Sequence, residues 1–294
     1  MKDRDLGGRE VSSRWIRRTV VLTAFVATML ATLFAPAGAI TEGELDGTRH
    51  PNVAMIVFYQ PDGRFRCSAT LVSPTVLVTA AHCTDGVRGK TIVTFETVAP
   101  AVPRAADDVG DGQSATGYTS TPAGWLTGTP HAHPLWDNEL QLNDLHDVGV
   151  VVLDTPYTAA TPVPIAPAGY LDGLSSGRGL SKERFEVIGY GVFFDKPTEG
   201  PQKPTAVADR TRRFTEAPGQ NISSQVLKLA ENGKDSRGGG GSCFGDSGGP
   251  ALHNGYLVAD TSFGASQFCR SFGGFYRLDT ADARSFLDDF VTLP

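Results

Sequence analysis

Short apolar runs separated by turn residues are the dominant pattern along this chain. Each run spans four to seven residues and is rich in β-branched side chains, as is typical of β-strands. Long amphipathic helical patterns are absent before the C-terminal end. The pattern predicts an all-β protein with strands at Val53–Tyr59, Ser68–Val72, Val76–Ala80, Ile92–Phe95, Val148–Leu153, Phe185–Ile188, Val226–Leu229 and Leu257–Thr261.

Three segments depart from the strand pattern. An Asp-Thr pair at positions 279–280 can cap a short C-terminal helix that runs through Phe286 and Phe290. The stretch Val98–Leu142 is rich in Pro, Gly, Thr and Asp and has little periodicity, so we expect long surface loops there, with an insertion as one interpretation. Pro156–Pro167 is Pro-rich and is predicted to connect two halves of the fold.

The N-terminal 39 residues have the pattern of a secretory signal peptide. A polar segment ends in Arg14, Arg17 and Arg18 just before the uncharged apolar run Thr19–Ala35, and Ala37 and Ala39 occupy the two positions that signal peptidase reads. An uncleaved signal anchor is the alternative, but the run of about 17 residues is at the short end for a spanning helix. The adjacent pair Arg17 and Arg18 leaves twin-arginine export open beside ordinary secretion.

Charge and cysteine content narrow the class of protein. Removing residues 1–39 takes away six basic and three acidic side chains, so the formal charge moves from -6 to about -9. Such an acidic chain without a basic stripe is not expected to bind nucleic acid. An even count of four cysteines in an exported chain indicates two disulfides. His131-Ala-His133 could hold a metal, but a solvated loop is the expectation, and no cofactor is predicted.

The segment Gly245–Pro250, with the sequence Gly-Asp-Ser-Gly-Gly-Pro, carries the strongest chemical signal. A serine hydroxyl needs a base beside it to become a nucleophile, and it needs N–H donors aimed at the developing oxyanion. The surrounding glycines allow a sharp turn and close approach of a substrate. Ser247 is therefore the predicted nucleophile, with the N–H groups of Gly245 and Ser247 as an oxyanion hole.

A histidine and an aspartate stand at strand ends where they could assist such a serine. His82 follows the apolar run that ends at Ala80, and Cys83 can tie down its loop, so His82 is the candidate general base. Asp147 opens the apolar strand at Val148, where a carboxylate needs hydrogen bonds to be tolerated. Asp144 and Asp154 are competitors, but neither of them opens the strand.

Taken together, the segment Thr79–Cys83, Asp147 and Gly245–Pro250 resemble the trypsin/chymotrypsin-like serine peptidases, which share the order His, Asp, Ser. The resemblance covers nearly all of Ile40–Pro294. It implies a secreted endopeptidase that hydrolyses peptide bonds through an acyl-enzyme. It implies two antiparallel six-stranded β-barrels, approximately residues 40–160 and 161–294, followed by a short C-terminal helix.

The same resemblance assigns further residues. Disulfides would join Cys67 to Cys83 and Cys243 to Cys269. The primary specificity pocket would be formed by residues Gly241, Ser262, Gly264 and Gly274. Because Gly241 at its floor is uncharged, apolar or aromatic side chains are the predicted preference, with Arg270 as a possible attraction for acidic ones. A new N-terminus at Ile40, created by signal peptidase, would pair with Asp246 and activate the enzyme.

The chain also departs from the family pattern. The spacing from His82 to Asp147 is long, other disulfides often seen in the family are missing, and the segment between Cys269 and Gly274 is unusual. Two alternatives to a peptidase remain: a binding protein that has lost catalysis, and an esterase with the same triad. We expect protein or peptide substrates, a monomer, and no membrane association once the signal peptide is removed.

Overall fold

A computed structural model describes residue 40 and residues 43–175, 179–195 and 205–294. All of these residues belong to one compact unit, Ala37–Pro294. The predicted signal peptide therefore lies outside the described residues. Within the described ranges, no helix has the length and apolar character that a membrane span requires.

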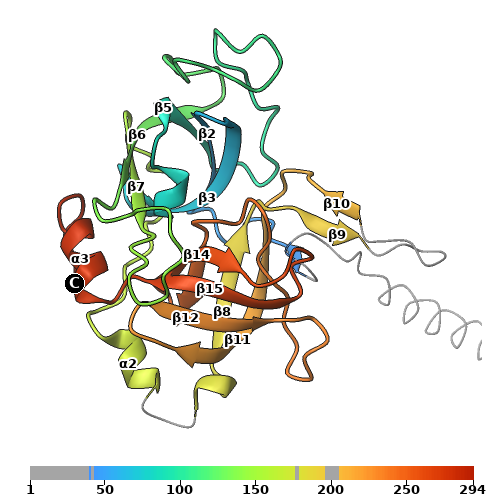
Figure 1. The fold of residues 1–294 in the computed structure, drawn as a ribbon, viewed down its shortest axis with the longest axis vertical. Coiled ribbons are helices and arrows are strands. Elements are labelled where there is room, and N and C mark those ends of the chain that lie inside the picture. The colour runs from blue at the N-terminus through green and yellow to red at the C-terminus, as the bar shows by residue number, and fades with distance from the viewer. Residues whose placement is uncertain (1–39, 41–42, 176–178, 196–204) are drawn as a thin grey trace, which may run out of the picture. The chain divides into compact units, whose positions relative to one another are not determined.

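The first half of the described chain forms a closed antiparallel barrel (Figure 1). Its six strands follow one another around the barrel in the order β2-β3-β4-β7-β6-β5. They comprise β2 (Val53–Gln60), β3 (Gly63–Ser73), β4 (Val76–Thr79), β5 (Arg88–Thr94), β6 (Leu126–Ala132) and β7 (Gly149–Leu153). A turn of 3-10 helix at Ala81–Cys83 follows β4.

The second half repeats this architecture. The order β11-β12-β15-β14-β13-β8 is closed by pairing of β8 with β11, and β1 (Glu44–Leu45) adds to β11. The six strands are β8 (Arg184–Gly189), β11 (Arg213–Ile222), β12 (Val226–Glu231), β13 (Pro250–His253), β14 (Tyr256–Gly264) and β15 (Ser271–Arg277). The two antiparallel six-stranded barrels confirm the predicted fold class.

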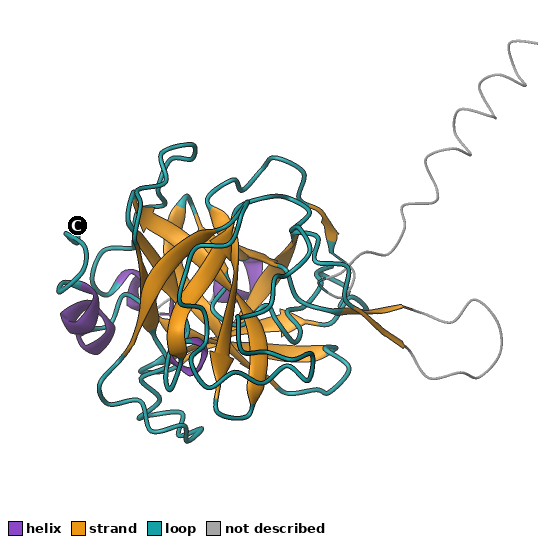
Figure 2. Cartoon of the chain, turned by 90° about the horizontal axis from the view of Figure 1, so that it is seen from above, coloured by secondary structure: helices purple, strands orange, loops and turns teal. Residues whose placement is uncertain are grey.

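The remaining elements are peripheral to the two barrels. A hairpin of β9 (Phe193–Asp195) and β10 (Thr205–Val207) projects from the surface, as Figure 2 shows. The described helices are short: α2 (Tyr170–Ser175), a 3-10 turn at Leu180–Lys182, and α3 (Ala281–Leu287).

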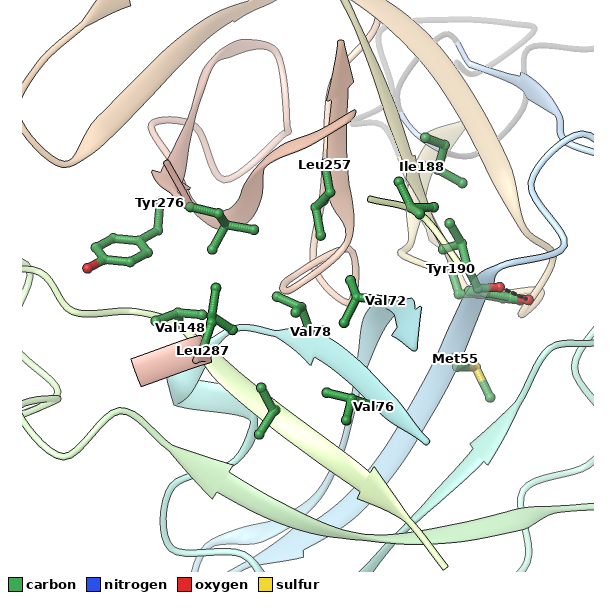
Figure 3. Close-up of a cluster of buried hydrophobic side chains, with 14 of the residues drawn as sticks. Met55, Val72, Val76, Val78, Val148, Ile188, Tyr190, Leu257, Tyr276 and Leu287 are labelled. Atoms are coloured by element: carbon green, nitrogen blue, oxygen red, sulfur yellow. Dashed lines mark hydrogen bonds between the residues drawn. The ribbon is translucent and has the colours of Figure 1, made fainter. Parts of the chain in front are cut away.

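Strand β2 illustrates why both of its faces are apolar. Val53, Met55, Val57 and Tyr59 belong to one buried cluster, whereas the alternating residues Ala54, Ile56 and Phe58 belong to another. Successive side chains of a strand point to opposite faces, so one face fills the first barrel and the other faces away from it. The outward face joins side chains of the second barrel, including Ile188, Tyr190 and Leu257, in the cluster of Figure 3. This shared core joins the two barrels.

All eight predicted strands are confirmed, but the predictions missed other elements. Strand β6 lies inside Val98–Leu142, which was expected to form only loops. Its sequence Leu-Thr-Gly-Thr-Pro-His-Ala has no apolar alternation, and hydrogen bonds to β5 and β7 on both sides hold it in the barrel. Thr280 caps α3 by accepting the Ala283 N–H, as predicted, but the helix ends at Leu287 and Phe290 follows in a turn.

Candidate active site

His82 lies in the short 3-10 turn that follows strand β4 of the first barrel. The turn is tied to β3 by the Cys67–Cys83 disulfide, one of the two pairings that the resemblance implied. The second pairing, Cys243–Cys269, is also present. Backbone and disulfide together fix the position from which the imidazole reaches the surface.

Asp147 is held by donors from both barrels. Its Oδ1 accepts the His82 N–H at 3.0 Å, and its Oδ2 lies 2.9 Å from His82 Nδ1. Ser262, on β14, donates its hydroxyl to the same Oδ2 at 2.5 Å. Asp147 is only 1% exposed, so these hydrogen bonds replace the water that a buried carboxylate loses. The carboxylate favours the tautomer with a proton on Nδ1, which leaves His82 Nε2 available as a base.

The electrostatics of His82 follow from this pairing. Burial lowers the pKa of the imidazole, but the charge of Asp147 and its hydrogen bond outweigh burial, so the pKa lies above its usual value. The competing aspartates serve elsewhere. Asp144 bonds His146 Nε2 at 2.6 Å, and Asp154 pairs with Lys90 at 2.7 Å.

Ser247 is carried on a loop that glycine makes possible. Gly248 has φ = +72°, and a Cβ there would lie 2.0 Å from Thr79 Oγ1. Ser68 of β3 anchors the loop, because its N–H donates to the Ser247 carbonyl at 2.8 Å and its hydroxyl donates to the Gly245 carbonyl at 3.1 Å. No described residue accepts a hydrogen bond from the Gly245 or Ser247 N–H. Both donors are therefore unused by the described chain.

His82 and Ser247 line one cavity of about 910 Å³, without a hydrogen bond recorded between them. Trp136 forms part of the wall, with its ring centroid 6.2 Å from that of His82. This tryptophan was not predicted as a site residue, because it lies in the aperiodic stretch that was interpreted as loops. The cavity also has an apolar rim that includes Phe58, Phe65, Val192 and Phe244.

A second cavity of about 210 Å³ adjoins Ser247 on the side of the second barrel. Of the four predicted pocket residues, Ser262 and Gly264 line it, whereas Gly241 and Gly274 do not. The ring of Phe263 covers Gly274, since a Cβ there would lie 2.2 Å from Phe263 Cζ. The other lining residues are Ser242, Cys243, Phe244, Ser247, Thr261, Phe263, Ser266, Gln267 and Cys269.

Two buried acids in the second half of the chain have raised pKa values. Asp246 is fully buried and accepts the N–H of Gly191 at 2.7 Å and that of Cys243 at 2.8 Å. Burial raises the pKa of Asp246 to about 6, against these hydrogen bonds and the charges of Arg66 and Arg213. The second acid, Glu231 at the end of β12, was not anticipated from the sequence. Burial raises its pKa to about 8.

Ile40 is fully buried, and the residues on either side of it lie outside the described part. In the uncleaved chain its nitrogen belongs to a peptide bond and carries no charge.

Two histidines and an aspartate form a further cluster of potential metal ligands. His133, His146 and Asp282 bring potential ligand atoms within 4.8 Å of one another. However, His133 Nδ1 accepts the Leu135 N–H at 3.2 Å, which puts the proton of the neutral ring on Nε2, facing Asp282. A protonated nitrogen cannot be a metal ligand. His131, the other predicted candidate, packs against the ring of Phe290 instead.

Comparisons with known proteins agree with this geometry. The Trypsin family matches residues 45–280. A trypsin of Saccharopolyspora erythraea is 27% identical over 230 residues, which cover 73% of this chain and 82% of that protein. A brachyurin of Leptuca pugilator is 28% identical, with coverage of 71% and 80%. A solved structure of HL collagenase has a TM-score of 0.55 at 16% identity and covers 84% of this chain and 94% of that one.

Proposed function

The chain belongs to the trypsin family and is a serine endopeptidase, and we propose that Ser247, His82 and Asp147 form its catalytic triad. The observation that carries this assignment is the buried Asp147 carboxylate on His82 Nδ1, with Ser247 on the wall of the same cavity. Protein or peptide substrates follow from the family. The residue roles below are specific to this chain.

In the proposed reaction, Ser247 Oγ attacks the carbonyl carbon of the peptide bond while His82 Nε2 takes the hydroxyl proton. The tetrahedral intermediate collapses when the imidazolium donates that proton to the departing amine, which leaves an acyl-enzyme. Water then repeats the sequence and releases the acid. The N–H groups of Gly245 and Ser247 stabilise the oxyanion, each contributing about 3 kcal/mol to the barrier reduction.

Replacement of the triad members tests the assignment. Ser247→Ala and His82→Ala should each lower kcat by about a millionfold, because the members act as one unit. Asp147→Asn should cost about ten-thousandfold by favouring the wrong imidazole tautomer. A sulfonyl fluoride should label Ser247 alone. Full activity of Ser247→Ala would refute the assignment, whereas absence of any turnover in the unlabelled wild-type protein would favour a binding protein.

The cavity of about 210 Å³ is the proposed primary specificity pocket, with Ser262 and Gly264 on its walls. No charged side chain lines it within the described chain, which supports a preference for apolar or aromatic substrate side chains. Cleavage of a peptide library at pH 6 tests this preference. Selective cleavage after Arg or Lys at that pH would contradict it.

Activation is proposed to follow cleavage before Ile40, which creates an ammonium group that pairs with Asp246. The buried carboxyl of Asp246 has two backbone donors but no cation in hydrogen-bond contact among the described residues, which supports an ion pair with the new N-terminus. An uncompensated charge of this kind costs about 3–5 kcal/mol. The pairing would therefore order the loop at Gly245.

The activation proposal includes secretion, since signal peptidase would make the cut. N-terminal sequencing of the secreted protein should return Ile40 as the first residue. A version with one extra residue before Ile40 should lose most activity, because its ammonium is displaced. Equal activity of the extended version would refute the mechanism and leave the triad untouched. The two disulfides support an oxidising compartment, and a monomer in solution is part of the same proposal.

A further inference from the structure

Glu231 is a buried acid for which the catalytic reaction has no use. The residue is 2% exposed, and its carboxyl is held by one neighbour. Oε1 accepts the Ser242 N–H at 2.9 Å, and Oε2 accepts the Ser242 hydroxyl at 3.0 Å. No ion pair joins Glu231 to a cation within the described part of the chain. A buried carboxylate without a cationic partner is costly, so its place in the fold needs a reason.

The strand register places this carboxyl on the pocket side of the second barrel. Gly264 of β14 pairs with Gly273 of β15, so side chains at these two positions would point to the same face of the sheet. At Gly264 that face is open, since a Cβ there would meet nothing within 4 Å, and Gly264 lines the cavity. At Gly273 a Cβ would lie 2.4 Å from Glu231 Cδ. The Glu231 carboxyl therefore lies against β15 on the same face of the sheet that lines the cavity at Gly264.

Glycine at a second position makes room for the same side chain. A Cβ at Gly241 would lie 2.7 Å from Glu231 Cβ. Gly241 is the position at which the sequence predicted an uncharged floor. Gly241 itself does not line the cavity, and Glu231 of β12 packs directly against it. Ser242 connects the cavity to Glu231, because it lines the cavity and also donates to the carboxyl.

We propose that Glu231 is a specificity-determining residue of the primary pocket, whose carboxylate, with the Ser242 hydroxyl in front of it, receives the cationic end of a Lys or Arg substrate side chain. This inference rests on the proposed function, because it needs Ser247 to cleave the bond that the pocket selects. A cation that enters the pocket meets no acidic group on the described lining, and Glu231 is bonded directly to the lining residue Ser242.

Ionisation of Glu231 makes this preference depend on pH. Burial raises the pKa of Glu231 to about 8, the hydrogen bonds from Ser242 oppose that rise, and the charge of Asp246 adds to it. Asp246 is the only charged group recorded as acting on Glu231 in the described chain, and Arg270, which precedes β15, forms no ion pair with it. Near pH 6 the pocket is neutral and accepts apolar side chains. Above pH 8 it carries a negative charge.

The experiment compares peptides that differ only in the residue before the cleaved bond, with Lys, Arg, Leu, Phe or Glu at that position. The ratio of kcat/KM for Lys over Leu cancels the titration of His82, which both substrates share. Lysine stays protonated throughout, because its pKa is about 10.4. If only the ionised carboxyl accepts the cation, the ratio should rise from pH 6 to pH 9 by up to about a hundredfold.

Two variants isolate the group. Glu231→Gln should abolish the rise in the Lys/Leu ratio, and the exposed Glu216→Gln in the same barrel should retain it. Titration of Ser247 with a sulfonyl fluoride counts folded sites in each preparation. If Glu231→Gln does not fold, the pH profile of the wild-type ratio still decides the matter.

A flat Lys/Leu ratio in the wild type, or a rise that persists in Glu231→Gln, would overturn the inference. Preference for the Glu peptide would overturn it as well and point to Arg270. These outcomes all require Ser247-dependent cleavage, so they differ from failure of the proposed function, in which no peptide is cut.

Discussion

His50 provides a test of how charge holds the two barrels together. The residue precedes β2, and both of its ring nitrogens face carboxylates: Nδ1 bonds Asp46, and Nε2 lies 3.0 Å from Glu186. An imidazole that donates from both nitrogens is protonated. Asp46 also accepts a hydrogen bond from the buried Arg212 at 2.7 Å. The segment before β2, strand β8 and the residue before β11 thus share one charge network.

The magnitude follows from the pKa of His50. Burial lowers it, but the hydrogen bonds and charges of Asp46 and Glu186 raise it from 6.5 to about 9. At about 1.4 kcal/mol for each tenfold change, this corresponds to about 3 kcal/mol. The Glu186 side chain is 44% exposed, so solvent screens part of its share, and about 2–3 kcal/mol is the expected contribution. Because the folded pKa is raised, this stabilisation is complete below pH 6.5 and is lost as the pH rises through 9.

The assay is urea unfolding of His50→Gln and its parent, both in a Ser247→Ala background that prevents self-digestion. At pH 6 the variant should be less stable by about 2–3 kcal/mol. At pH 10 the difference should have shrunk by about that amount, because His50 is then neutral in both the folded and the unfolded state. A difference that does not change between pH 6 and pH 10 would refute the reasoning, as would an NMR titration of His50 centred near 6.5.

Two further predictions concern single positions in the second barrel. Asp260 is fully buried, and neither of its carboxyl oxygens has a hydrogen-bond partner among the described residues; burial and the charge of Asp147 raise its pKa well above the usual value. The folded state retains a proton on Asp260 that the unfolded state loses above pH 4, so Asp260 destabilises the fold more as the pH rises. Asp260→Asn should therefore raise Tm more at pH 8 than at pH 4. An equal rise in Tm at both pH values would contradict this. Gly248→Ala should abolish peptidase activity, because its Cβ meets Thr79 Oγ1 in the loop that positions Ser247. Gly255 has a similar positive φ but open space around it, so Gly255→Ala should leave kcat/KM intact. The free energy of unfolding of Gly255→Ala should fall by only about 1 kcal/mol.

The sequence was informative wherever one local rule decided the structure. In both barrels, apolar runs such as Val148–Leu153 form strands that are buried on both faces, so their composition alone predicts a strand. Thr280 and Gly248 are similarly local, since a helix cap and a positive φ constrain the residue type directly. Strand β6 could not be predicted in this way, because its hydrogen bonds come from neighbours far along the chain.

The same distinction applies to the site. His82, Asp147 and Ser247 each lie in a segment with its own signal, and the resemblance supplied their relation. Glu231 lies at the end of an ordinary strand, and nothing in its flanking residues indicates a pocket. Its position emerges only when the register of β14 with β15 brings Gly264 opposite Gly273. Trp136 was missed for a similar reason, because only the folded loop brings it to His82.

The two donors to Asp147 come from different barrels, and this has a consequence for folding of the nascent chain. The His82 N–H comes from the first barrel and the Ser262 hydroxyl from the second. If the proposed triad is correct, a nascent chain that has folded only its first barrel would hold a histidine and an aspartate but no nucleophile. A fragment of the second barrel alone would hold a serine without a base. Peptidase activity would then arise only once both barrels have folded, and no half-folded form of this chain would contain a complete triad.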